Sequence, residues 1–262
     1  MSRYKLVVQY DGSEFSGWQL QKKSRTVQGV LEDAVQKITN SKDRIPVHGS
    51  GRTDAGVHAW AQVAHTDIEI KLSVDSIKKA LNGNLPQDCR IVGVEHTHND
   101  FHSRYDAKSR YYRYQCYIGD SILYRNQSWV VPGLNIEFLN TLAIKLMGEH
   151  DFLSFCKFRH DLKNTKCIIY HSEWKFDHEM LTFIIGGNRY LHHMIRYLVG
   201  TMIAVHETQF SKKEFLSLLE IPRKDVHVFK APAQGLILEK INYAYTLFTY
   251  HHWSVYFNAL RR

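Results

Sequence analysis

The sequence predicts an α+β fold made of two similar halves. Strand and helix patterns occur in hairpin-like pairs and not as strict β-α-β repeats, which favours α+β over a doubly wound sheet. Both halves run strand, helix, strand, an order that suggests duplication although no sequence repeat is visible. The 262 residues are enough for two domains of ordinary size. We place the boundary in the polar stretch at 100–108, giving halves of 1–105 and 106–262.

Hydrophobic periodicity and capping residues define the elements of the first half. Apolar residues at every second position predict the first strand. Thr26 and Ser73 precede apolar stripes at helical spacing, so each is expected to cap a helix. In order, the sequence predicts a strand at 3–10, a helix from Thr26, a strand near 57–66, a helix from Ser73 to about Gly83 and a strand at 91–95.

The second half carries the same kinds of signal. Asn135 and Ser211 are expected to cap helices, and 177–180 is expected to turn between two strands. The other predicted elements are a strand at 111–118, strands near 168–177 and 181–188, a helix at 191–206, a strand at 236–243 and an aromatic tail over 245–262.

Composition favours a polyanionic partner inside the cell. The formal net charge is +8 and the pI is near 9.2, and a field of this sign attracts phosphate backbones. No apolar run approaches the roughly eighteen residues of a membrane span, and the start lacks the apolar core of a signal peptide. Four widely spaced cysteines suit a reducing compartment. We therefore expect a cytoplasmic protein without membrane contact.

A glycine-rich loop at 49–59 carries the strongest chemical signal. Its sequence, Gly-Ser-Gly-Arg-Thr-Asp-Ala-Gly-Val-His-Ala, places Asp54 close to Arg52 and Thr53. Glycines permit backbone angles that other residues avoid, so a tight and specific loop shape is expected. A simple connecting turn needs only Asn-Gly or Asp-Gly. Two interpretations stay open, a capped surface turn with a salt bridge and a rigid loop that holds one reactive carboxylate.

Other chemistries find little support in the residues. His192 and His193 are adjacent on a predicted helix, where they would point apart, so no metal site is expected. A serine-nucleophile elbow at Ser50 would need glycine at the position of His48. Phosphate-loop and dinucleotide fingerprints are missing, so no nucleotide cofactor is expected.

Asp54 remains as the candidate reactive group. A flanking arginine favours the anion at neutral pH, which suits a nucleophile or an electrostatic partner for a developing cation. Tyrosines on the 111–118 strand could stack on a base swung out of an RNA stem, although most strand tyrosines pack in the core. Arg196 lies off the apolar stripe of its predicted helix, where an arginine is usually solvated.

Residues 51–58, Gly-Arg-Thr-Asp-Ala-Gly-Val-His, resemble the signature loop of the TruA family of tRNA pseudouridine synthases. The similarity covers nearly the whole chain in the expected order. The other matching segments are 10–12, 15–19, 26–32, 81–82, 85–86, 101–104, 107–114, 150–155, 192–196 and 231–236.

The resemblance implies roles for individual residues. Asp54 matches the catalytic aspartate, and Arg196 matches the arginine that pairs with it. Tyr112 matches the tyrosine that stacks on the target base, while Tyr114, on the same strand face, is the alternative for that role.

Three further residues are expected around the substrate. Arg52 would shape the loop or meet RNA phosphate, and Leu236 and Leu238 would line the pocket. Two features depart from the family pattern. Lys230 stands where a small hydroxyl residue is more usual, and the tail at 245–262 extends past the last family strand.

The resemblance also implies the reaction and the fold. In the family reaction the N1–C1′ bond of uridine breaks, the base rotates and a C5–C1′ bond forms, so no cofactor is required. The expected targets are uridines 38, 39 and 40 in the tRNA anticodon stem-loop. The implied protein is a homodimer with tRNA lying across both subunits. Each half would be a mainly antiparallel sheet with helices on one face, in the pseudouridine synthase fold, with the active site between the halves.

The residues leave both the catalytic route and the function open. Asp54 could attack C1′, could remove a ribose proton in a glycal-type route, or addition at C6 of uracil could take place. A tyrosine could help to remove the C5 proton. The alternative functions are a non-catalytic tRNA-binding or chaperone protein on the same scaffold and a hydrolase that uses Asp54.

Overall fold

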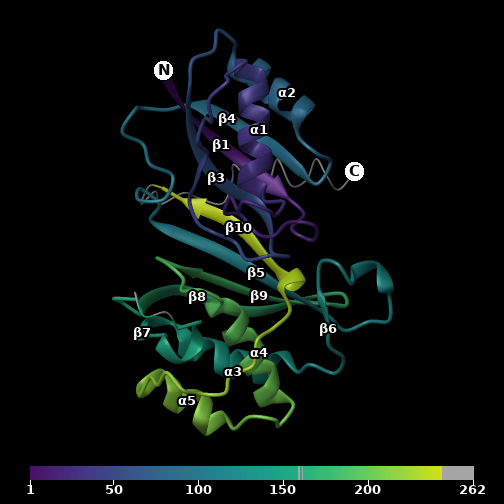
Figure 1. The fold of residues 1–262 in the computed structure, drawn as a ribbon. Helices are drawn as coiled ribbons and strands as arrows, with labels where there is room; N and C mark the ends of the chain where they lie inside the picture. The colour runs from purple at the N-terminus through teal and green to yellow at the C-terminus, as the bar shows by residue number, and fades with distance from the viewer. Residues whose placement is uncertain (159, 161, 244–262) are drawn as a thin grey trace.

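The computed structural model describes residues 1–158, 160 and 162–243 (Figure 1). The aromatic tail expected at 245–262 lies outside the described residues. Within the described part of the chain, no helix combines the length and apolar character needed to cross a membrane.

Helices and strands follow the predicted order, with some short strands added. The helices are α1 (Val27–Thr39), α2 (Val74–Asn84), α3 (Ile136–Ala143), α4 (Met194–His206) and α5 (Lys212–Glu220). The strands are β1 (Ser2–Tyr10), β2 (His48–Gly49), β3 (His58–Ile68), β4 (Cys89–His96), β5 (Ser109–Tyr117), β6 (Trp129–Val130), β7 (Gly148–Asp151), β8 (Lys166–Asp177), β9 (Met180–Gly187) and β10 (Leu236–Asn242).

All four expected helix caps are confirmed. The side chains of Thr26, Ser73, Asn135 and Ser211 each accept a hydrogen bond from a backbone N–H in the first turn of their helix. Such a bond satisfies one of the amide donors that a helix leaves unpaired at its start. The predicted hairpin is also confirmed, because β8 and β9 pair antiparallel with Asp177 opposite Met180.

One helix boundary was predicted wrongly. The expected helix at 191–206 begins at Met194, and His193 occupies the N-cap with a left-handed backbone at φ 64°. Apolar residues upstream of Met194 continue the helical spacing, so the pattern predicts a start that is too early. The helix cannot include His193, because a residue with a left-handed backbone cannot continue a right-handed helix. The turn matters because it redirects the two histidines.

The described strands form one sheet in the order β4-β1-β3-β10-β5-β9-β8-β7, with β2 paired to β3 and β6 paired to β5 beside this path. Most neighbouring strands are antiparallel, and β10 is the strand that joins the two groups. It pairs antiparallel with β5 and parallel with β3. In Figure 1 β10 crosses the middle of the molecule, with α1 and α2 beside the N-terminal strands and α3, α4 and α5 beside the C-terminal ones. The predicted α+β fold with a mainly antiparallel sheet is confirmed, whereas the boundary at 105/106 stays a prediction.

Two loops of the N-terminal part pack against each other and shape the glycine-rich loop. Trp18 N–H donates to the Thr53 carbonyl at 3.1 Å, and Gly56 N–H donates to the Phe15 carbonyl at 3.3 Å. Gly12 approaches the backbone of Val57 so closely that an added Cβ would clash with its carbonyl oxygen. The loop around Asp54 is therefore held by backbone contacts to the segment 11–19.

Gly12→Ala should destabilise the protein because the new methyl group meets backbone atoms that cannot rotate away. We expect the free energy of unfolding to fall by about 3 kcal/mol, the upper part of the usual cost of overpacking. Gly51→Ala is the matched control, since nothing lies within 4 Å of a Cβ there. It should change the free energy by less than about 1 kcal/mol. Urea unfolding curves measure both, and equal stability of the two variants would contradict this packing.

Candidate active site

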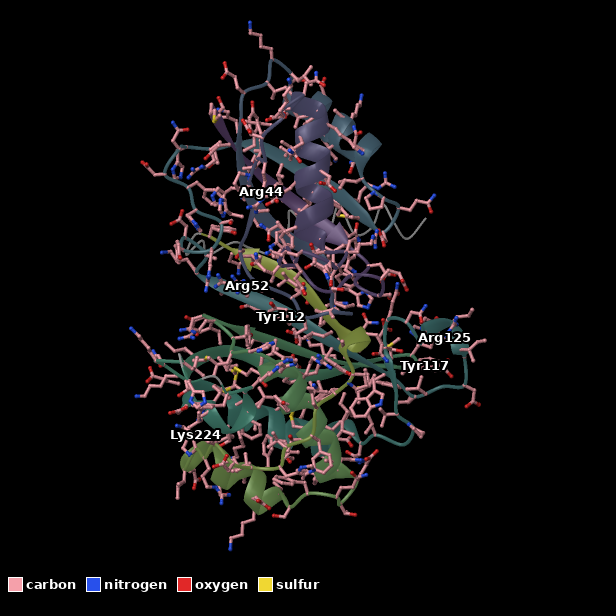
Figure 2. The ribbon with its side chains drawn as sticks, viewed as in Figure 1. Arg44, Arg52, Tyr112, Tyr117, Arg125 and Lys224 are labelled. Atoms are coloured by element: carbon pink, nitrogen blue, oxygen red, sulfur yellow. The ribbon has the colours of Figure 1, made fainter. Side chains whose placement is uncertain are left out.

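Asp54 lies in a cavity of about 1150 Å³ where the N-terminal and C-terminal elements meet. The glycine-rich loop forms one wall, and the turn at 189–193 together with the first residues of α4 forms another. Arg52 and Tyr112, which also line this cavity, lie near the middle of the molecule in Figure 2. The cavity brings together residues that are more than one hundred positions apart in the sequence.

The carboxylate of Asp54 faces Arg196 of α4. Arg196 Nη1 lies 3.4 Å from Asp54 Oδ2, and the arginine and aspartate side chains are only 11% and 20% exposed. Arg196 Nε donates to the Ala231 carbonyl at 2.8 Å, and Ala231 N–H donates back to the Arg196 carbonyl at 2.9 Å. These bonds fix the guanidinium, so Arg196 is directed at the carboxylate and is not solvated.

Two histidines complete the surroundings of the carboxylate. His193 Nδ1 lies 3.3 Å from Asp54 Oδ2, and His192 Nε2 lies 3.5 Å from Oδ1. Burial lowers the pKa of His193 to about 4, and although Asp54 acts in the opposite direction, burial dominates. His193 is therefore neutral at pH 7, and Arg196 is the buried cation at the carboxylate.

The expectation that His192 and His193 point apart is wrong. They precede α4, and the left-handed backbone of His193 brings their ring centroids to 4.0 Å with a 34° tilt. With Asp54 they offer three ligand atoms within 4.8 Å of one another. However, the Arg196 guanidinium lies at the same carboxylate oxygen, and its positive charge opposes a second cation there. This arrangement favours a carboxylate that pairs with Arg196 over a carboxylate that binds a metal ion.

Tyr112 and Tyr114 have different surroundings although both belong to β5. Tyr112 lines the cavity, and its ring packs edge-on against Tyr190 at 5.3 Å. Burial raises the pKa of Tyr112 to about 12. Tyr114 is fully buried, is not a cavity residue, and donates its hydroxyl to the Pro232 carbonyl at 2.9 Å. Of the two rings, Tyr112 lines the cavity and Tyr114 does not.

The remaining expected site residues also differ in whether they line the cavity or lie in the core. Leu236 lines the cavity, whereas Leu238, opposite Tyr112 in the strand pairing, is 1% exposed and packs in the core. Arg52 is exposed at the cavity and has no hydrogen-bond or ion-pair partner among the described residues. Lys230, the departure from the family pattern, is exposed and close enough to His193 for its charge to lower the pKa of that imidazole.

Arg110 is a structural residue of the site that sequence reasoning missed. It donates hydrogen bonds to the carbonyls of Ser50 at 3.1 Å, Arg104 at 2.9 Å and Asn188 at 3.0 Å. Burial lowers its pKa. Nothing in its spacing marks it, because its three partners come from separate parts of the chain.

The cavity wall is strongly cationic. Asp54 is the only carboxylate among the described lining residues. The basic side chains on the wall are Arg44, Arg52, Arg104, Arg110, Lys157 and Arg189. Such a surface attracts phosphate groups. The fold and the site together define an α+β protein with a cavity whose cationic wall suits a polyanionic substrate and whose described lining residues include one carboxylate, Asp54.

Comparison with known proteins identifies the family. A family model described as tRNA pseudouridine synthase matches residues 6–106 and 142–244. The tRNA pseudouridine synthase A of Geobacillus kaustophilus (strain HTA426) is 36% identical over 244 residues, covering 92% of this chain and 94% of the relative. That of Limosilactobacillus reuteri (strain DSM 20016) is 39% identical over 249 residues, covering 93% and 97%. The chain therefore belongs to the tRNA pseudouridine synthase family, and the expected class, an isomerase acting on tRNA, is confirmed.

Solved structures add little to this assignment. The crystal structure of a Cbf5-Nop10-Gar1 complex aligns with a TM-score of 0.38 at 12% identity. The alignment covers 97% of this chain and 64% of that chain.

His193 should make stability depend on pH. Its folded-state pKa of about 4 lies below the value of 6.5 for a free imidazole, so between these values the unfolded chain binds the proton more readily. The free energy of unfolding should therefore decrease as the pH falls from about 6.5 toward 4. Asn tolerates the left-handed backbone, so His193→Asn should lose less stability than the natural protein between pH 7 and pH 5. Equal losses in urea unfolding at the two pH values would contradict the assignment.

Proposed function

We propose that this protein converts uridines 38, 39 and 40 of the tRNA anticodon stem-loop to pseudouridine, with Asp54 as the nucleophile. The observation that carries the proposal is the placement of Asp54 as the only carboxylate among the described residues of a cation-lined cavity. Arg196 fixes it from one side, and Tyr112 is near enough for the aspartate charge to raise the pKa of the phenol.

The reaction needs one reactive carboxylate and a means of holding the base. The N1–C1′ bond breaks, the base rotates in place, and the C5–C1′ bond forms while the proton on C5 leaves and N1 gains one. In the proposed route Asp54 attacks C1′; removal of a ribose proton by Asp54 and addition at C6 of uracil are the alternative routes. Because nothing is added to or lost from the substrate overall, no cofactor is required.

The neighbouring residues have complementary roles in this proposal. Arg196 orients Asp54 and lies close enough to balance the charge of its carboxylate. Tyr112 stacks on the target base and holds it after it leaves the RNA stem. A phenol is protonated at neutral pH and burial raises the pKa of Tyr112 further, to about 12, so its hydroxyl would relay the C5 proton and would not begin as a phenolate.

Substrate binding would use the rest of the wall. Leu236 provides an apolar contact beside the base, and Arg52, exposed and without a partner among the described residues, contacts RNA phosphate. Tyr114 and Leu238, which are buried in the core, would support these residues without contacting the base.

The cellular setting follows from the family resemblance. We propose a cytoplasmic homodimer with one tRNA lying across both subunits. Each subunit would consist of the halves 1–105 and 106–262, with the cavity between them. The positive charge of the chain supports this arrangement because a long RNA requires a wide cationic surface.

The alternatives make different predictions. A tRNA-binding or chaperone protein that has lost turnover would be expected to lack at least one of Asp54, Tyr112 and Arg196. All three are present: Asp54 and Tyr112 line the cavity, and Arg196 contacts the Asp54 carboxylate. A hydrolase would use the same carboxylate but would release free uracil. The complete set of residues favours the isomerase.

Asp54→Asn should abolish turnover because an amide of the same shape cannot replace the carboxylate. Removing such a group should lower kcat by about four orders of magnitude or more. Tritium release from tRNA labelled at C5 of uridine measures the rate. Asp75→Asn, in the first turn of α2 and away from this cavity, is the matched control and should keep full activity. A folded Asp54→Asn protein with substantial turnover would refute the proposed role.

A further inference from the structure

Tyr105 presents a large aromatic ring to solvent at the wall of the active-site cavity. It is 73% exposed, while most aromatic side chains of the described residues are buried or partly buried. It lies between β4 and β5, ahead of the strand that carries Tyr112. The proposed reaction does not use it.

The exposed ring stands at the end of a column of aromatic side chains. Its centroid lies 4.3 Å from that of His102, with a tilt of 36°. His102 in turn packs against His65 at 4.7 Å, and His65 stacks on His48 at 5.0 Å. His65 is 3% exposed, so the column is anchored in the core of the N-terminal part.

Backbone hydrogen bonds hold the same segment in place. The N–H groups of Arg104 and Tyr105 both point at His102 Nδ1, at 3.1 and 3.4 Å. Asp106 closes the turn, because its carboxylate accepts from His102 N–H at 2.7 Å and its own N–H donates to the His102 carbonyl at 3.1 Å. The turn at 102–106, which carries the Tyr105 ring, is therefore ordered before any ligand binds, and this order lowers the entropic cost of binding.

The surroundings of the ring fit a nucleobase. A cavity of about 1150 Å³ exceeds the range of roughly 300–1,000 Å³ that a single small ligand fills. Arg104 is exposed beside Tyr105, and its guanidinium lies 5.8 Å from the ring centroid, while Arg110 lies on the same wall. An aromatic face flanked by cations is the usual arrangement for a stacked base and its phosphates.

We propose that Tyr105, supported by His102, stacks on a nucleobase that neighbours the target uridine in the bound RNA strand. Arg104 pairs with a backbone phosphate of the same strand. This inference rests on the proposed function, because it assumes that RNA enters the cavity. Tyr105 is a positioning residue: it holds the strand so that the flipped uridine reaches Asp54.

Replacing the ring tests the stacking. Tyr105→Ala should weaken tRNA binding about 10- to 100-fold, the range expected for loss of one base–aromatic stack. Tyr105→Phe keeps the ring and should bind within about threefold of the natural protein. Tyr170→Ala is the matched control, since Tyr170 is 45% exposed on β8 and is not a cavity residue, and it should bind normally. Filter binding with unmodified tRNA transcript measures all four proteins.

Kinetics and salt dependence distinguish stacking from other roles. In tritium-release assays Tyr105→Ala should raise KM with little change in kcat, because the lost contact is present before and during the reaction. The slope of log Kd against the logarithm of the salt concentration should be the same for Tyr105→Ala as for the natural protein. Arg104→Gln should instead reduce that slope by about 0.7–0.9, the loss of one phosphate contact. Thermal unfolding should be unchanged in Tyr105→Ala, given the exposure of the ring.

Several results would overturn the inference. These are normal tRNA binding by Tyr105→Ala, equal weakening by Tyr105→Phe, or a changed oligomeric state with unchanged tRNA affinity, which would assign the ring to a protein contact. Failure of the proposed function is separate, since it would appear as absence of tritium release by the natural protein. Comparing the tRNA affinity of Asp54→Asn with that of the double variant Asp54→Asn/Tyr105→Ala tests the stacking contact in the absence of turnover.

Discussion

The contact between Asp54 and Arg196 is the interaction on which the site depends. It joins a loop of the N-terminal part to a helix of the C-terminal part, 142 residues later in the chain. Each partner is fixed independently, Asp54 by the loop packing around Gly12 and Trp18, and Arg196 by its two bonds to Ala231. A buried guanidinium is costly without an anion, so the two parts of the protein are held in the relative position that places the carboxylate in the cavity.

The central strand makes this geometry possible. β10 follows Ala231 closely and pairs with β3 on one side and β5 on the other. The same strand therefore connects the anchor of Arg196, the start of the strand after the Asp54 loop and the strand of Tyr112. One continuous sheet therefore holds together the segments that carry Asp54, Tyr112 and the anchor of Arg196, although they lie far apart in the sequence.

Local patterns predicted most of the fold, and long-range contacts determined what they missed. The caps at Thr26 and Asn135 and the alternation of β1 depend only on neighbouring residues, so the sequence was sufficient. The position of β10 between β3 and β5 is set by pairing across the chain. Family resemblance pointed to Asp54, Tyr112 and Arg196, and the structure shows that Tyr112, but not Tyr114, lines the cavity.

The turn before α4 shows the same limit most clearly. Periodicity extended the helix through His192 and His193, whereas the left-handed backbone at His193 turns both rings toward Asp54. The hydrogen bonds of Arg110 were likewise not predictable from the sequence, because its guanidinium donates to three carbonyls from separate segments. Such residues have no local signature, since their function is to hold parts of the chain that meet only after folding.

The most direct test of the account is a map of pseudouridine in unmodified tRNA after treatment with the purified protein. The account predicts new pseudouridine at positions 38, 39 and 40 and no free uracil. Absence of new pseudouridine at these positions would contradict it, and release of uracil would assign the Asp54 cavity to a hydrolase.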